Sequence, residues 1–469
     1  MNQKRKLTSN FIALSIGEIA SKGLNIAVFI YLARILDPDG FGMISFANST
    51  TLIYAVFVNL GFDIIGMRTI SKDPNQINKY VNNSITLKLL ISVLLFMILI
   101  LHVSLVHLTM QQKVLILISG LNFFSITFTL NWVFQAYERM WLIAFRQFLA
   151  GIITLIGALV LVHGKDDIVA AMSITLIVNV IIAVWLIVVY KKNYGPIKFE
   201  LDYELGKSLL KSGIAFGLMN LMITFYNSAT IQIIGYMTSE WETGIFSAAL
   251  RFYAFMVLPS TIAQGVFFPR ISKANTPESR DSIMKQFSFF SMLLGCFIGV
   301  FFFVYADNFT IILGPKFNGT SGLLKFMSIS TILVYMTVTY NSALLSWGYE
   351  KKVVKWIFLS ALTSISINIL LIPHYGIYIS AVTTIISEII AVSGILFLYS
   401  KTKQKIYFSD LFKFLFLSVV SVFISKIAWD LGLQINLAEC LAVFIYIALL
   451  FIFKIIKISY IKEILTNEV

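Results

Sequence analysis

Residues 168–190 read IVAAMSITLIVNVIIAVWLIVVY, and this stretch decides the fold class. It contains no charged residue and no proline or glycine. As a helix rising about 1.5 Å per residue, it would be roughly 34 Å long. Because the hydrocarbon core of a bilayer is about 30 Å thick, the stretch predicts one membrane-spanning helix.

Apolar runs of similar length recur along the whole chain, which is 58% hydrophobic and only 13% charged, with a mean hydropathy of +0.86. We therefore predict an all-α integral membrane protein with about fourteen transmembrane helices. The expected helices cover residues 10–33, 41–65, 84–107, 113–135, 141–163, 168–190, 212–236, 243–268, 286–306, 321–347, 353–373, 377–399, 410–428 and 437–456.

The formal charge of +13 does not indicate nucleic-acid binding, because the basic residues lie in short clusters between the apolar runs. Cys296 and Cys440 lie far apart in two apolar runs, which argues against a disulfide framework or a metal site. The N-terminal MNQKRKLTSN precedes a long apolar run and predicts an uncleaved signal anchor.

The basic residues also predict the orientation of the chain. With the N-terminus placed in the cytoplasm, roughly 27 of the 36 lysines and arginines fall on the cytoplasmic side and about five on the outer side. Both termini should therefore be cytoplasmic, and the number of helices should be even.

The two halves of the chain resemble each other at an offset of about 202 residues. This offset aligns FGMISFA at residues 41–47 with TGIFSAA at residues 243–249, and it aligns Asn25 with Asn227 and Arg68 with Arg270. A repeat of six helices keeps the same orientation and implies two lobes related by a pseudo-two-fold axis along the membrane normal. The predicted parts are an N-lobe (1–190), a cytoplasmic linker (191–211), a C-lobe (212–400) and a C-terminal helix pair (401–469).

Several functions are disfavoured by what the sequence lacks. No outer loop is long enough for a catalytic domain, so we do not expect an enzyme. No GxxxxGK[ST] loop is present, so we expect no nucleotide-driven transport within this chain and no cofactor. A proton or sodium gradient is the expected driving force.

Charges inside the apolar runs are few, and each costs about 2.5–3.5 kcal/mol to insert at the bilayer centre. Glu18 and Lys22 lie one turn apart in the first helix, on one face with Ser15 and Asn25. This face predicts either a salt bridge that lets the helix insert or a cavity lining that contacts substrate or a coupling ion. Both alternatives predict contact between Glu18 and Lys22.

Arg251 lies about 12 Å into the eighth helix and requires an anionic partner. The alternatives are a protein acid or backbone carbonyls, or a pyrophosphate, which suits the fork of a guanidinium group. The predicted pyrophosphate site combines lysine and arginine residues: Lys22, Arg251, Arg68 and Arg270.

Polar residues also form stripes in the seventh and eleventh helices. These stripes predict either hydrogen bonds between helices or contact with a sugar. The candidate sugar-binding residues are Ser15, Asn25, Asn220, Thr224, Asn227 and Asn368. The candidate carriers of a coupling ion are Glu18, Asp63 and Glu388. Pro259 should kink the eighth helix.

Several blocks of this sequence resemble those of polysaccharide and O-antigen flippases, in order and spacing. The blocks are GEIASKGLN at 17–25, LARILDPDGFG at 32–42, GFD at 61–63 followed by Arg68, GIFSAALR at 244–251, PRIS at 269–272 and NILLIPHYGI at 368–377. The similarity covers both halves to about residue 400.

The resemblance implies a V-shaped transporter of the superfamily that also holds multidrug antiporters and lipid II flippases. It implies transfer of an undecaprenyl-pyrophosphate-linked oligosaccharide to the outer leaflet of a bacterial plasma (inner) membrane. It also implies that polymerase and chain-length proteins of the same pathway are partners, and that the last two helices help form a groove for the lipid tail. Many relatives carry an acid near Asn227, and its absence here leaves ion coupling at that position open.

Two other functions remain as alternatives. A multidrug antiporter would be expected to have an acidic or apolar cavity rather than Lys22 and Arg251. A membrane polysaccharide polymerase or ligase would need a large outer loop with catalytic residues.

Overall fold

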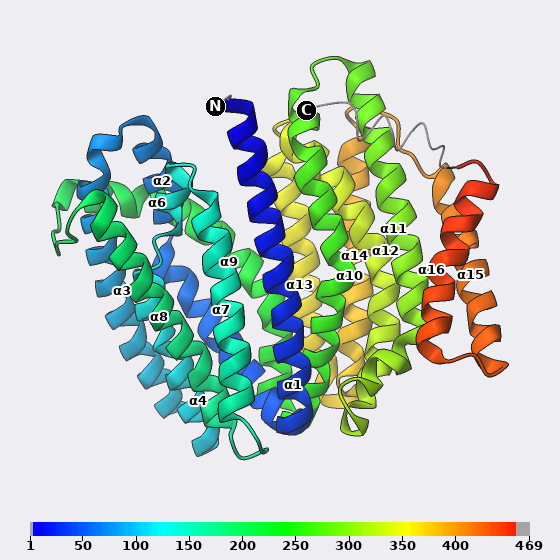
Figure 1. Ribbon diagram of the computed structural model, residues 1–469, viewed down its shortest axis with the longest axis horizontal. Coiled ribbons are helices and arrows are strands. Elements are labelled where there is room, and N and C mark those ends of the chain that lie inside the picture. Colours follow the sequence, from blue (N-terminus) through cyan, green and yellow to red (C-terminus); the bar gives the residue numbers. More distant parts are fainter. Residues whose placement is uncertain (1–2, 456–469) are drawn as a thin grey trace. The chain divides into compact units, whose positions relative to one another are not determined.

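The structure is a computed structural model that describes the backbone of residues 3–455. It describes the side chains of residues 20–455 except 215, 216, 218, 219, 222, 223, 226, 227 and 409. The described chain is helical, without a strand (Figure 1).

Fourteen helices account for the predicted membrane spans. Twelve segments of the described chain are long and apolar enough to cross a membrane. The first of them is kinked at Asp37 and therefore holds two spans, and the 35-residue helix α9 (Tyr203–Met237) supplies the remaining one. The predicted all-α membrane fold is confirmed.

The chain divides into two compact units, residues 1–247 and 248–469. The division lies within α10 (Glu240–Lys273), whereas the predicted linker is 191–211. Helix α9 belongs to the first unit because Gln232 Nε2 donates to the Ser49 carbonyl of α1, at 2.9 Å. The predicted lobe boundaries follow the repeat rather than the contacts, and they stay a prediction.

The first unit contains a large apolar core to which α1 and the helices from α2 to α8 contribute. Its further elements are α1 (Gln3–Asn59), α2 (Phe62–Lys72), η1 (Pro74–Gln76), α3 (Ile77–Leu105), α4 (Met110–Gly120), α5 (Asn122–Thr127), α6 (Asn131–Ala136), α7 (Met140–Leu161) and α8 (Ile168–Tyr194).

Two sharp corners shape the beginning of the chain. At Asp37 the backbone has φ 58° and ψ 172°, and Pro38 starts the next helical segment, as expected for a turn between two helices. The second corner lies at Leu60 and Gly61, both with positive φ, and it ends α1 before α2 begins. The predicted helix 41–65 is therefore too long at its C-terminal end.

The predicted fourth helix, 113–135, is instead broken into α4, α5 and α6. Near the breaks, two hydroxyl groups donate hydrogen bonds to one backbone carbonyl. Ser92 Oγ and Thr127 Oγ1 each donate to the Phe123 carbonyl, at 3.1 Å. Non-helical backbone at membrane depth is tolerated where protein groups satisfy it in this way.

The sequence repeat is visible as a reciprocal contact within the first unit. A Cβ atom at Gly42 would overlap the carbonyl oxygen of Glu240, and one at Gly244 would overlap that of Pro38. The offset of about 202 residues that relates Gly42 to Gly244 also relates Pro38 to Glu240. Such an exchange of partners is expected for a two-fold related contact, and only glycine permits the approach.

The second unit consists of the rest of α10 and the helices that follow. They are α11 (Pro277–Ile311), η2 (Pro315–Phe317), α12 (Gly319–Ser346), α13 (Glu350–Tyr375), α14 (Tyr378–Ser400), α15 (Ser409–Asp430) and α16 (Ile435–Ile452). The last pair, α15 and α16, packs against α11, where Tyr446 donates to the Leu293 carbonyl at 2.8 Å (Figure 1).

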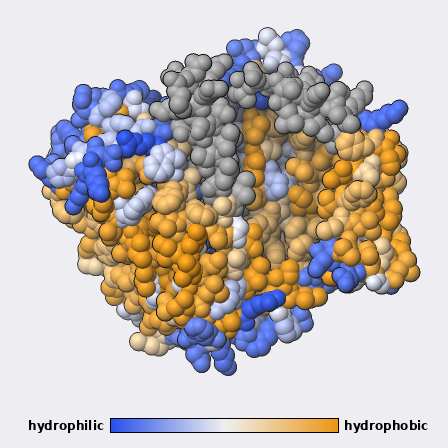
Figure 2. Space-filling model, viewed as in Figure 1, coloured by the Kyte–Doolittle hydropathy of each residue, from blue (hydrophilic) through white to orange (hydrophobic). Residues whose placement is uncertain are grey.

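The surface agrees with a membrane location. Hydrophobic side chains cover the visible sides of the helices, and hydrophilic residues gather toward the helix ends (Figure 2). Leucine, isoleucine, valine and phenylalanine side chains are exposed in every long helix, which suits contact with lipid.

Candidate functional site

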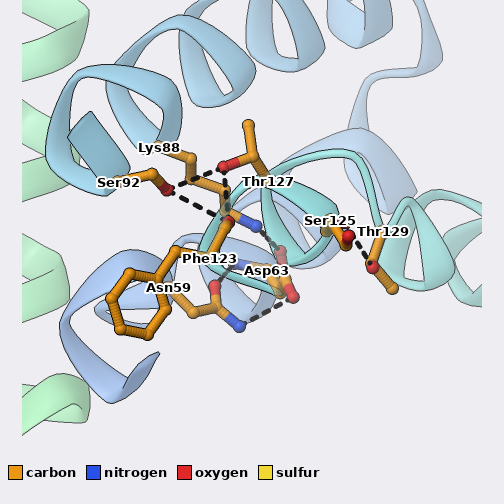
Figure 3. A network of polar contacts seen from close by, with 8 residues as sticks. All are labelled: Asn59, Asp63, Lys88, Ser92, Phe123, Ser125, Thr127 and Thr129. Carbon is orange, nitrogen blue, oxygen red and sulfur yellow. Dashed lines mark hydrogen bonds and ion pairs between the residues drawn. The ribbon is translucent and has the colours of Figure 1, made fainter. Parts of the chain in front are cut away.

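The first unit contains a buried charge pair, formed by Asp63 of α2 and Lys88 of α3 (Figure 3). Lys88 Nζ lies 2.5 Å from Asp63 Oδ1, and the exposed fractions of the two side chains are 2% and 28%. Asn59 Nδ2 donates to Asp63 Oδ2 at 2.8 Å. Asp63 also lies in the first turn of α2, where the helix dipole stabilises a carboxylate.

The pair changes the interpretation of Asp63. Removal of this carboxylate would leave Lys88 buried without a counter-charge, and breaking such a pair typically costs about 3–5 kcal/mol. In this conformation the Asp63 carboxylate therefore serves as the counter-ion of Lys88. Its role in ion coupling stays a prediction.

Lys88 was not among the predicted residues. The expected third helix began at residue 84, which placed Lys88 near a helix end, but α3 begins at Ile77. Lys88 therefore lies about 16 Å along the helix, roughly 1.5 Å for each residue. A lysine inside an apolar run was the available signal.

The predicted face of the first helix is only partly described. Lys22 is half-buried and Asn25 is exposed. The side chains of Ser15 and Glu18 lie outside the described residues, so the contact between Glu18 and Lys22 stays a prediction.

Arg251 differs from Lys88, because it is exposed and has no hydrogen bond or ion pair to any residue that the structure describes. Arg68 and Arg270 are likewise exposed and have no acidic partner in the described chain. The Arg270 guanidinium lies over the ring of Phe267, 5.7 Å from its centroid. These arginines remain available to an anionic ligand.

The polar stripe of α9 continues beyond its predicted residues. Asn220 and Thr224 are half-buried, and the side chain of Asn227 lies outside the described residues. Further along α9, Gln232 bonds to α1, and Tyr236 Oη lies 3.1 Å from Nε2 of His102 in α3. This end of the stripe joins helices.

The polar residues of α13 and α14 also join helices. Asn368 is fully buried, and its Oδ1 accepts from Thr383 at 2.7 Å. This burial favours the interhelical alternative for Asn368 over contact with a sugar. Glu388 of α14 is 8% exposed and accepts from Thr337 of α12 at 3.4 Å.

An apolar groove of about 470 Å³ lies between α11, α12 and α15. Val300, Phe303, Ile329 and Val419 are among its lining residues, and Lys426 stands at one end. Lys426 Nζ lies 2.9 Å from Asp430 Oδ1, so its charge is already paired.

Comparison with known proteins assigns the chain to a family. The sequence pattern described as "Polysaccharide biosynthesis protein" matches residues 7–275, more than half of the chain. The chain belongs to the polysaccharide biosynthesis protein family. The chain is similar to a candidate O-antigen transporter of Escherichia coli K12, with 22% identity over 85% of this chain and 98% of the relative. A candidate O-antigen transporter of Shigella dysenteriae is 24% identical over 78% of this chain and 93% of the relative.

Solved structures support the fold of this family member. The lipid II flippase MurJ in an inward-closed conformation has a TM-score of 0.79 at 15% identity, covering 94% of this chain and 98% of that chain. A multidrug transporter of the MATE family in an inward-facing conformation has a TM-score of 0.62 at 14% identity, covering 84% and 99%. At these identities the likeness concerns the fold alone.

Proposed function

We propose that the protein is a flippase that moves an undecaprenyl-pyrophosphate-linked oligosaccharide from the cytoplasmic to the outer leaflet of a bacterial plasma membrane by alternating access. The family and the relatives named as O-antigen transporters support the substrate class. The observation that carries the proposal is Arg251, an exposed guanidinium within an apolar helix with no acidic partner in the described chain. A pyrophosphate would supply the missing anion.

Lys22, Arg68 and Arg270 are the further predicted pyrophosphate-binding residues. Arg270 follows Arg251 in α10 by about 28 Å along the helix, so these two arginines would bind the pyrophosphate at different stages of transport. Asn25, Asn220 and Thr224, none of them fully buried, are the better-supported sugar contacts, together with the predicted Ser15 and Asn227. The groove along α15 suits part of a lipid chain, because its lining is almost entirely apolar. Partner polymerase and chain-length proteins would act on the exported unit.

A gradient of protons or sodium ions drives the proposed cycle. Among its candidate carriers, Glu388 is a buried carboxylate with a hydroxyl neighbour, whereas Asp63 is neutralised by Lys88. Glu18 remains a further candidate. A multidrug antiporter is disfavoured, because an unpaired arginine would repel its cationic substrates.

The test is export of lipid-linked repeat units in a strain without other flippases. Deletion of the gene should leave these units on the inner leaflet, and the wild-type gene should restore export. Normal export after deletion would reject the proposal. Collapse of the proton gradient, with and without sodium, then identifies the driving ion.

A further inference from the structure

A second groove, of about 290 Å³, lies between α10 and α11 in the second unit. Along α10 it runs from Pro259 to Arg270, about 16 Å at 1.5 Å per residue. Gln286, Phe290 and Leu294 of α11 form its other wall. The groove is therefore lined mainly by apolar side chains and has a cation, Arg270, at one end.

Aromatic packing makes the floor of this groove rigid. The buried ring of Phe267 stacks on Phe287 of α11, with centroids 4.7 Å apart and planes at 12°. Phe267 also packs against Phe290, at 6.1 Å. Ile262 and Val266 are about half exposed and form the rim. The floor is thus held by the protein, and the rim is open to a chain from the bilayer.

The charge at the end of the groove distinguishes it from the groove along α15. Lys426 is paired with Asp430, whereas Arg270 lies over the ring of Phe267 and has no acidic partner among the described residues. An arginine on an aromatic face keeps its donors directed outward and can bind phosphate oxygens in a bidentate manner. The α10/α11 groove therefore offers an unpaired guanidinium beside an apolar channel.

We infer that the α10/α11 groove binds the first part of a polyprenyl pyrophosphate, with the pyrophosphate on Arg270 and the isoprenoid chain along Val266, Phe290 and Pro259. A groove of about 290 Å³ has room for part of one apolar chain, which suits a lipid with one chain better than a phospholipid with two. With the termini in the cytoplasm, the turn between α10 and α11 lies at the inner leaflet, where the substrate is supplied. The inference rests on the proposed function and identifies a loading site for it.

The test measures binding of undecaprenyl pyrophosphate to the purified full-length protein in phosphatidylcholine nanodiscs by native mass spectrometry. Arg270→Gln removes the fork, and Val266→Trp fills the channel from its exposed rim. Each variant should weaken binding about tenfold or more, because the loss of a charged hydrogen bond or of buried apolar contact lowers the binding free energy by about that amount. Lys273→Gln removes an equal charge one turn away, outside the groove lining, and should bind within about twofold of wild type.

The inference fails if either Arg270→Gln or Val266→Trp binds like wild type while correctly folded, as judged by thermal unfolding. It also fails if phosphatidylglycerol displaces the probe at equal mole fraction, because the groove would then be a general lipid site. Export by wild type in cells is measured separately. Normal export with no selective binding rejects only the groove, whereas absence of wild-type export rejects the proposed function.

Discussion

Lys88 in the first unit and Arg251 in the second are both cations within apolar helices, but their surroundings differ. Lys88 is 2% exposed and bonded to Asp63; Arg251 is exposed and has no partner in the described chain. A charge that the protein itself neutralises contributes to the fold, whereas a charge left open is available to a ligand. The presence or absence of an acidic partner, rather than the charge itself, therefore distinguishes a cation that stabilises the fold from one that is available to a ligand.

The largest expected effect on stability comes from breaking the ion pair between Asp63 and Lys88. Asp63→Asn leaves Lys88 buried without a counter-charge and should cost about 3–5 kcal/mol. Lys88→Met should lower the free energy of unfolding by less, because the Asp63 side chain is 28% exposed and can be hydrated. Thermal unfolding of the purified protein and its amount in the membrane measure both effects.

The double variant Asp63→Asn with Lys88→Met is the control. Removing both charges should recover most of the stability, because no unpaired group remains. If the double variant is as unstable as Asp63→Asn alone, the pair does not explain the loss. If it is stable but fails to export, Asp63 or Lys88 has a transport role beyond the fold.

The unpaired cation gives the second largest expected effect: Arg251→Gln should lower export at least tenfold with little change in stability. The reason is that no described protein group loses a partner, whereas a pyrophosphate would lose charged hydrogen bonds. Arg251→Lys keeps the charge but not the fork and should retain part of the export. Full export by Arg251→Gln would remove the pyrophosphate assignment.

Hydropathy predicted the helices well, because insertion depends on the composition of each segment by itself. The contact of Gly42 with Glu240 also agrees with the predicted repeat. The pairing of Asp63 with Lys88 was not predictable, because it depends on how two segments pack and on where α3 begins. The broken fourth helix escaped prediction for a similar reason: the hydroxyl groups near its breaks come partly from α3.

Burial likewise bears on the choice that the sequence leaves open for Asn368. The residue type allows either a sugar contact or an interhelical hydrogen bond. Its complete burial against Thr383 favours the hydrogen bond, and the sugar contact stays a prediction. Sequence therefore identified which polar residues lie in the membrane, but not which way each of them faces.

Glu388 tests an intermediate case, a buried carboxylate with a hydroxyl neighbour. Glu388→Gln keeps the volume and an oxygen acceptor for Thr337, so the protein should remain folded. If Glu388 carries the coupling ion, export by this variant should fall severalfold and lose its dependence on the gradient. Thr337→Val is the control for the hydrogen bond. Export by Glu388→Gln that is as sensitive to gradient collapse as wild type would reject Glu388 as the carrier.

The smallest effect is expected for Lys426, whose charge is paired but at a helix end. An exposed pair four residues apart in a helix contributes only about 0.3–0.5 kcal/mol, and here the exposed fractions are 32% for Lys426 and 61% for Asp430. Lys426→Gln should therefore leave thermal unfolding nearly unchanged and export within about twofold of wild type. Asp430→Asn sharpens the comparison, because it removes the carboxylate that is paired with Lys426, and retention of phosphatidylglycerol measured by native mass spectrometry should then rise. Lys426→Gln could instead lose as much export as Arg251→Gln. A paired cation would then also serve a ligand, and the distinction between paired and unpaired cations would fail.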